Sequence, residues 1–152
     1  MRPARSAVLL KARTREAQIT ELEATKSERG LVITLGDVLF DINKSELRSG
    51  AEYTIGKLAA FLAEYPTRNL LIEGFTDSTG TAEYNQGLSE RRTDAVRNIL
   101  VNRGIDSRRI MTRGCGVDFP VANNQTAEGR QRNRRVEVII SDGDGHILER
   151  TY

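Results

Sequence analysis

With 152 residues, the chain has room for one domain and an extension, and 38% hydrophobic with 29% charged residues is an ordinary globular composition. The net charge of +2 is too small to argue for nucleic-acid binding, and the single cysteine, Cys115, excludes an intrachain disulfide. No apolar run approaches membrane-spanning length. The start has too short an apolar run for a signal peptide, so we interpret the chain as a fragment whose membrane anchor is missing.

The first 30 residues predict a polar helical spacer. Residues 5–28 are rich in helix formers, and Ala12, Ile19 and Leu22 form only a thin apolar stripe along them. Gly30 is of the residue type that often follows the end of a helix. The stripe is too short and too polar for a coiled coil, which needs several sustained heptads. We therefore expect a spacer, and a dimer formed through this helix is the alternative.

From residue 31 to residue 141, strand-like and helix-like segments alternate. Four segments have strand character: 31–40, 69–75, 109–114 and 133–141. Two segments have apolar residues at helical spacing: 45–65 and 82–102. Residues 116–129 are expected to form a loop, and 142–152 a tail that opens with a tight turn at 142–145. The order β-α-β-α-β-β predicts an α/β (α+β) two-layer sandwich, with a mixed sheet of about four strands and helices on one face.

One acid and one base stand out near the middle of this domain. Asp77 is in the loop before the second helix, and Arg92 is on that helix. A face of the helix carries Asn85, Ser89, Arg92 and Val96, and the adjoining stripe of Tyr84, Leu88, Ala95 and Ile99 is expected to face the core. A carboxylate and a guanidinium on separate elements can bind a zwitterion. Alternatively, Asp77 caps the helix and Arg92 forms a surface ion pair.

Several short motifs occur in one order along the chain. They are Val38-Leu-Phe-Asp-Ile-Asn43, Gly74-Phe-Thr-Asp77, Tyr84-Asn85, Leu88-Ser89, Arg92, Gly104-Ile105, Gly114-x-Gly116, Pro120-Val121 and Asn133-Arg-Arg-Val-Glu137. Together they resemble the OmpA-like domain family, which includes the periplasmic half of OmpA-type porins, peptidoglycan-associated lipoproteins and the flagellar stator protein MotB. The resemblance covers roughly residues 31–141. Many members have His before Thr-Asp, whereas this chain has Phe75.

The resemblance implies a non-catalytic domain that binds the peptide stem of peptidoglycan at diaminopimelate. Asp77 would take the ammonium group of the free D-centre, and Arg92 the adjacent carboxylate. The surrounding pocket would comprise Thr76, Asn85, Arg134 and the turn with Phe40 and Asn43, and Arg135 is the next candidate if the register is off by one. Substituting Asp77 or Arg92 is then expected to abolish binding and leave the fold intact. The location implied is the periplasm, at the outer membrane, and an interaction or oligomerisation module is the alternative use of the fold.

Other functional classes find little support. Hydrolysis of peptidoglycan would need a catalytic carboxylate pair, a metal site or an activated nucleophile, and one His with one Cys gives no zinc cluster. We therefore expect no enzyme activity, no metal and no cofactor. The basic cluster at residues 130–135 lacks interleaved aromatic residues. Arg134 and Arg135 would also point to opposite faces of a strand, which argues against nucleic acid as a partner.

Overall fold

The computed structural model describes residues 15–36, 49–145 and 147. Its elements are α2 Arg15–Glu21, β1 Thr25–Ser27, β2 Gly30–Gly36, α3 Ser49–Glu64, β3 Leu70–Phe75, α4 Ala82–Asn102, the 3-10 helix η2 Ser107–Arg109, β4 Ile110–Gly114, α5 Ala127–Asn133 and β5 Arg135–Ile140. Two residues expected in the pocket, Phe40 and Asn43, lie outside the described residues. Within the described ranges, no helix is long and apolar enough to cross a membrane.

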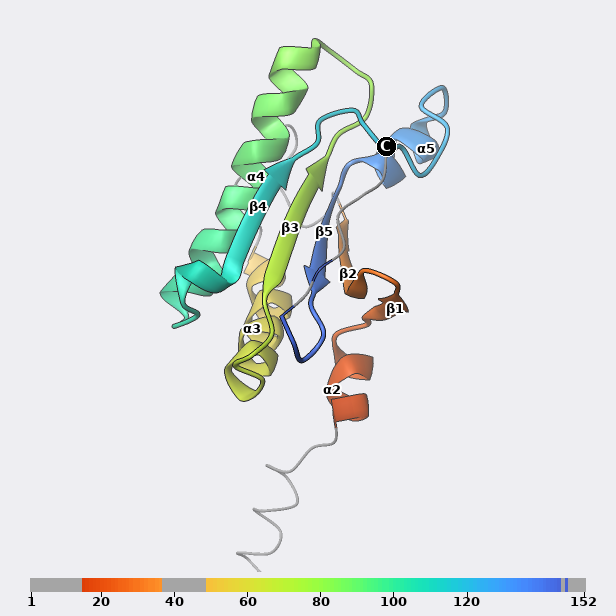
Figure 1. Cartoon of the computed structure of the whole chain (residues 1–152). Helices are drawn as coiled ribbons and strands as arrows, with labels where there is room; N and C mark the ends of the chain where they lie inside the picture. Colours follow the sequence, from red (N-terminus) through yellow and green to blue (C-terminus); the bar gives the residue numbers. More distant parts are fainter. Residues whose placement is uncertain (1–14, 37–48, 146, 148–152) are drawn as a thin grey trace, which may run out of the picture.

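The described strands form one mixed sheet in the order β1-β2-β5-β3-β4. Only β3 and β4 run parallel, and the other neighbours are antiparallel. Helices α3 and α4 lie on one side of this sheet (Figure 1). The main core fills the space between, where alternate residues of β2 and β5 meet apolar side chains of α3 and α4. The two-layer architecture with helices on one face is therefore confirmed.

The sheet has five strands, not about four, because the expected N-terminal helix ends early. Glu23 adopts a left-handed backbone with φ of 55°, which stops α2. Thr25–Ser27 then pairs with β2 as a short edge strand, and the Ser27 hydroxyl donates to the Gly30 carbonyl oxygen at 2.9 Å. A helix over 22–28 was thus a wrong expectation. Backbone pairing with β2 outweighs the helix propensity of this polar segment.

The expected loop at 116–129 and the strand from 133 also need correction. Residues 127–133 form helix α5, whose N-cap Thr126 accepts a hydrogen bond from the Gly129 N–H at 3.0 Å. A Cβ atom at Gly129 would lie 1.8 Å from the Asn123 carbonyl oxygen, so this turn packs directly on the preceding loop. The last strand consequently begins at Arg135. A helix of seven residues with a polar sequence shows no apolar period from which it could be predicted.

Two glycines let α4 approach the ends of β3 and β4 closely. A Cβ atom at Gly74 would lie 2.6 Å from the Ser89 carbonyl oxygen, and one at Gly114 would lie 2.5 Å from Cγ of Glu90. Any larger residue would push the helix away from the sheet. The close contact fixes the first half of α4 beside the carboxyl ends of the two parallel strands. The candidate site lies there.

Candidate functional site

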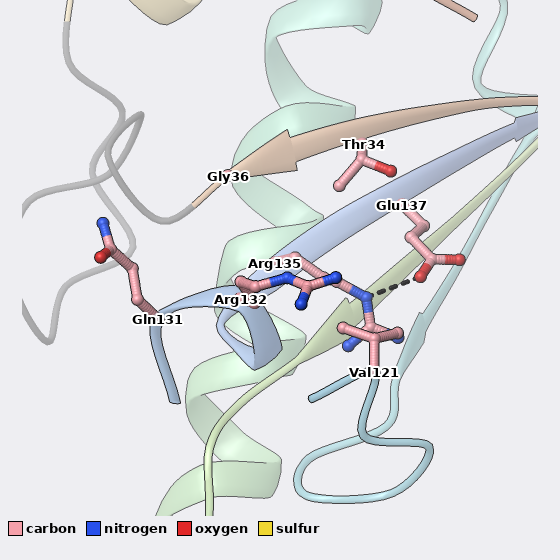
Figure 2. Close-up of a pocket in the computed structure, with 7 residues that line it drawn as sticks. All are labelled: Thr34, Gly36, Val121, Gln131, Arg132, Arg135 and Glu137. Carbon is pink, nitrogen blue, oxygen red and sulfur yellow. Dashed lines mark hydrogen bonds and ion pairs between the residues drawn. The ribbon is translucent and has the colours of Figure 1, made fainter. Parts of the chain in front are cut away.

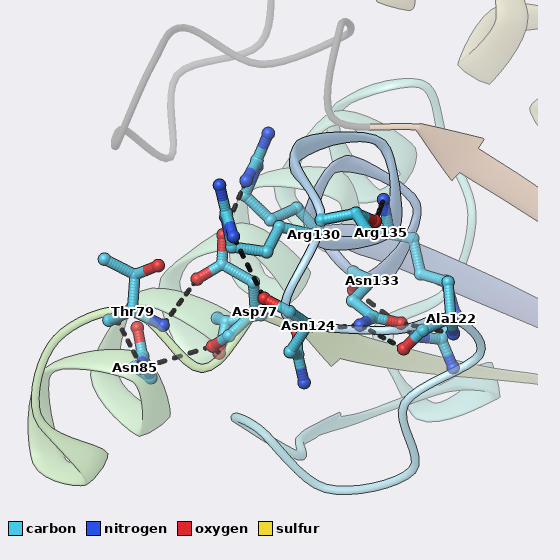
Figure 3. A network of polar contacts seen from close by, with 12 residues as sticks. Asp77, Thr79, Asn85, Ala122, Asn124, Arg130, Asn133 and Arg135 are labelled. Carbon is cyan, nitrogen blue, oxygen red and sulfur yellow. Dashed lines mark hydrogen bonds and ion pairs between the residues drawn. The ribbon is translucent and has the colours of Figure 1, made fainter.

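Asp77 lies in the loop that leaves the carboxyl end of β3, and it is only 6% exposed. Its Oδ1 accepts a hydrogen bond from the Thr79 N–H at 2.7 Å (Figure 3). Its Oδ2 accepts a hydrogen bond from Nη1 of Arg134 at 2.5 Å. Arg134 is 57 residues further along the chain, at the end of α5. The carboxylate is therefore held in one orientation by a local turn and by a distant cation.

The cap of α4 is Thr81, not Asp77. The Thr81 hydroxyl accepts the Tyr84 N–H at 3.1 Å and so satisfies one of the unpaired N–H groups in the first turn. The interpretation of Asp77 as a helix cap is thus wrong. The acid remains available for a role in the loop itself.

Asn85 and Thr76 close the Asp77 loop from its two sides. The Asn85 amide donates to the Thr79 carbonyl oxygen at 2.9 Å and to that of Asp77 at 3.4 Å (Figure 3). The Thr76 N–H donates to the Gly116 carbonyl oxygen at 2.7 Å, and the Thr76 hydroxyl donates to the Asp77 carbonyl oxygen at 3.0 Å. Both residues are buried. The structure therefore brings Thr76, Asn85 and Arg134 together around Asp77.

Arg92 is 1% exposed and lies on the same face of α4 as Asn85, seven residues further on. Seven residues of α-helix span about 10 Å. Because helical side chains lean toward the N-terminus, the Arg92 side chain leans toward the Asp77 loop. The alternative of a surface ion pair is wrong, because the side chain is buried. The expectation that Arg92 can be truncated without harm to the fold also needs revision, since a buried guanidinium must have its own partners.

The face of α4 that carries Asn85, Ser89, Arg92 and Val96 is buried along its length. The adjoining stripe was expected to face the core, but Tyr84 at its start is 46% exposed. Among its other members, Leu88 is buried, whereas Ala95 and Ile99 are only partly buried. The polar face is thus the one that packs on the sheet. Gly74 and Gly114 provide the space for it there.

The two consecutive arginines at the junction of α5 and β5 contact different partners. Arg134 reaches Asp77, whereas the Arg135 guanidinium lies 3.8 Å from the centre of the Phe75 ring and donates to Glu137 at 2.6 Å. Phe75 is 1% exposed and is the register partner of Arg135 across β3 and β5. Phe75 therefore supports a buried cation. Arg134, and not Arg135, lies at the Asp77 loop.

Comparisons with known proteins decide the family. The model of the OmpA family matches residues 39–134. The chain belongs to the OmpA family. It is 50% identical over 105 residues to outer membrane porin F of Pseudomonas aeruginosa, an alignment that covers 68% of this chain and 30% of the porin.

A lipoprotein and a solved structure extend the likeness. The chain is 34% identical over 116 residues to the peptidoglycan-associated lipoprotein of Brucella melitensis, covering 76% of this chain and 69% of the lipoprotein. Its fold matches the cell wall anchor of the T6SS from Pseudomonas aeruginosa with a TM-score of 0.70 and 27% identity, covering 83% of this chain and 94% of the other. The resemblance inferred from the motifs is therefore confirmed, while the chain spans less than a third of the porin.

One residue of this OmpA-family domain was not assigned a role from the sequence. Asn133 is fully buried, and its Oδ1 accepts the N–H groups of Val121 and Ala122 at 2.7 and 2.9 Å. Its Nδ2 donates to the Ala122 carbonyl oxygen and to Oδ1 of Asn124 (Figure 3). Asn133 thus connects the loop before α5 to the end of that helix, next to Arg134. The only signal in the sequence was its place in the Asn133-Arg-Arg motif.

The ionisation of Asp77 follows from these contacts. Burial by itself would raise the pKa of the Asp77 carboxyl, but hydrogen bonds from the Thr79 backbone and the Arg134 guanidinium outweigh it, so the pKa lies below its usual range. The pair therefore stabilises the fold above about pH 4, and this contribution is lost as the pH falls through the lowered pKa. Among the described residues, no group of three or more His, Cys, Asp or Glu could hold a metal ion.

We expect Arg134→Ala to raise the pKa of Asp77, because it removes the cation that favours the ionised form. An NMR titration of the Asp77 carboxyl carbon would measure the titration midpoint in wild type and in Arg134→Ala. Arg132→Ala is the matched control, since Arg132 is on the same helix but does not contact Asp77. Equal midpoints in wild type and Arg134→Ala would contradict the assigned pair.

Proposed function

We propose that this domain binds peptidoglycan non-covalently, through the free D-centre of diaminopimelate in the peptide stem. Asp77 binds the ammonium group of that centre, and Arg92 binds its carboxylate. The observation that carries the proposal is the buried Asp77 carboxylate, held ionised and oriented at the carboxyl end of β3. Loops at strand ends are common places for ligand sites, and charged groups with shifted pKa values often occur in such sites.

The Asp77 carboxylate can accept a ligand without losing its present partners. A carboxylate offers about four acceptor positions, and Thr79 and Arg134 do not use all of them. An ammonium group can therefore join the pair. The side chain of Arg134 is 29% exposed, so it can also contact a bound stem from the solvent side. Thr76 and Asn85 act by holding the loop, through the hydrogen bonds described above.

Arg92 supplies the second charge that a zwitterion needs. Its planar guanidinium can grip a carboxylate with two parallel hydrogen bonds. Two ionic contacts made at once would favour a zwitterion over a ligand that offers only one of them. The proposed role in the cell is to attach an envelope component, in the periplasm at the outer membrane, to the cell wall. The names of a porin, a lipoprotein and a cell wall anchor among its relatives support this role.

The test is a set of co-sedimentation experiments with purified sacculi that differ in one group of the stem. We expect binding to diaminopimelate-type sacculi and at least about tenfold weaker binding to amidated diaminopimelate, which lacks the carboxylate for Arg92. Lysine-type sacculi, which lack the second carboxylate altogether, should bind at background level. Equal binding to all three would contradict recognition of the D-centre. Failure to bind any of them would favour the alternative use of the fold as an interaction module.

A further inference from the structure

A hollow lies on the sheet face that α3 and α4 leave uncovered (Figure 2). Its volume is about 500 Å³. Residues from β2, β5, α5 and the loop before α5 line it, among them Thr34, Val121, Gln131, Arg132, Arg135 and Glu137. The proposed function assigns no role to this hollow, and its size is in the range of small-molecule sites.

Among the described residues around the hollow, one cation has no counterion. Arg135 is 4% exposed and pairs with Glu137 at 2.6 Å, so these two charges cancel at the floor. Arg132 is exposed at the rim, and among the described residues it forms no ion pair. The described lining residues therefore carry a net charge of about +1. A ligand with a carboxylate fits this charge, whereas a cation does not.

The remaining lining groups suit a short peptide. The Thr34 hydroxyl and the Gln131 amide are exposed, and within the described part of the chain neither makes a hydrogen bond through its side chain. Such groups can donate to and accept from a peptide backbone. Val121 is 49% exposed, and its side chain can contact a small apolar group of a ligand. A few convergent polar groups beside an apolar contact are typical of a binding pocket.

The hollow lies at the same end of β5 as the Asp77 loop. Arg134 contacts Asp77, and the next residue, Arg135, is the first of β5 and lines the hollow. A stem held at Asp77 can therefore extend past the start of β5 toward the hollow. In the stem, diaminopimelate has a glutamate with a free α-carboxylate before it and an alanine with a terminal carboxylate after it.

We propose that this hollow is a second subsite that binds a carboxylate of a residue next to diaminopimelate in the same stem peptide. Arg132 binds the carboxylate, and Gln131 and Thr34 bind the adjacent peptide group. The inference rests on the proposed function, because the stem must first be held at Asp77. It adds that the domain recognises a stretch of stem and not the D-centre alone.

Calorimetric titration of the full 152-residue chain with three soluble ligands tests the subsite. The ligands are free diaminopimelate, the stem tripeptide that ends at diaminopimelate, and the tetrapeptide with the following alanine. We expect at least one peptide to bind about tenfold more tightly than free diaminopimelate. Arg132→Ala should remove this gain and leave the affinity for free diaminopimelate unchanged. Arg91→Ala, which removes an exposed arginine of α4 outside the hollow, should keep the gain.

The ligand series separates the outcomes. A gain that is already present in the tripeptide assigns the carboxylate to the glutamate, and a gain confined to the tetrapeptide assigns it to the alanine. If free diaminopimelate binds but the peptides bind no more tightly, or if Arg132→Ala keeps the gain, the second subsite is wrong and the proposed function stands. If none of the three ligands binds, both proposals are wrong.

Discussion

Asp77→Asn is expected to lower the affinity for diaminopimelate-type sacculi by at least about thirtyfold, which corresponds to about 2 kcal/mol. Asparagine has the same shape as aspartate and keeps an acceptor for the Thr79 N–H, but it carries no charge to hold an ammonium group. Co-sedimentation over a range of sacculus concentrations would measure the loss. A thermal unfolding curve of the same variant would show whether the fold is kept.

The fold of Asp77→Asn should survive because the partner cation is not trapped. The side chain of Arg134 is 29% exposed, so its charge can be solvated when Asp77 is neutral. The matched control is Asp94→Asn, which removes one exposed carboxylate of α4 away from the loop and should bind as wild type does. Wild-type binding by Asp77→Asn would refute the assignment of Asp77. Loss of binding in Asp94→Asn as well would show that net charge, and not the site, governs sedimentation.

The longer elements of this fold could be predicted from the sequence because each carries its own signal. The helix at 82–102 was predicted with the bounds that α4 has, since a 3.6-residue period runs along it and Gly104 follows its end with φ of +97°. The short elements could not. β1 and α5 have three and seven residues, and both are stabilised by contacts with distant segments, such as the pairing of β1 with β2.

The candidate site shows the same division between local and distant information. Motifs placed Asp77 in a loop and Arg92 on a helix, and both placements are confirmed. The contact between Asp77 and Arg134 depends on the strand order, which brings the start of β5 beside the end of β3. Spacing along the chain carries no information on that neighbourhood. The burial of Arg92 depends likewise on two glycines in β3 and β4 that admit a polar helix face to the sheet.

The burial of Arg92 changes the expected effect of its truncation, because the fold as well as binding should be affected. Truncation to alanine removes a large side chain that is 1% exposed, and it leaves a cavity and buried polar groups without their partner. We expect Arg92→Ala to lower the free energy of unfolding by about 3–5 kcal/mol, measured by urea denaturation. Its loss of binding would then report on the fold as much as on the site. Arg91→Ala, the exposed neighbour on α4, should change the stability by less than about 0.5 kcal/mol.

Arg92→Lys separates the two roles. Lysine keeps the positive charge and much of the side-chain volume, so the loss of stability should be clearly smaller than for alanine. An ammonium group cannot form the two parallel hydrogen bonds of a guanidinium, so binding to diaminopimelate should fall by at least about tenfold. A folded Arg92→Lys variant with wild-type affinity would remove Arg92 from the site and leave it a structural cation. A folded variant that binds weakly and binds amidated and unamidated diaminopimelate equally would place the ligand carboxylate at Arg92. Discrimination between the two ligands is lost only when the residue that binds this carboxylate is altered.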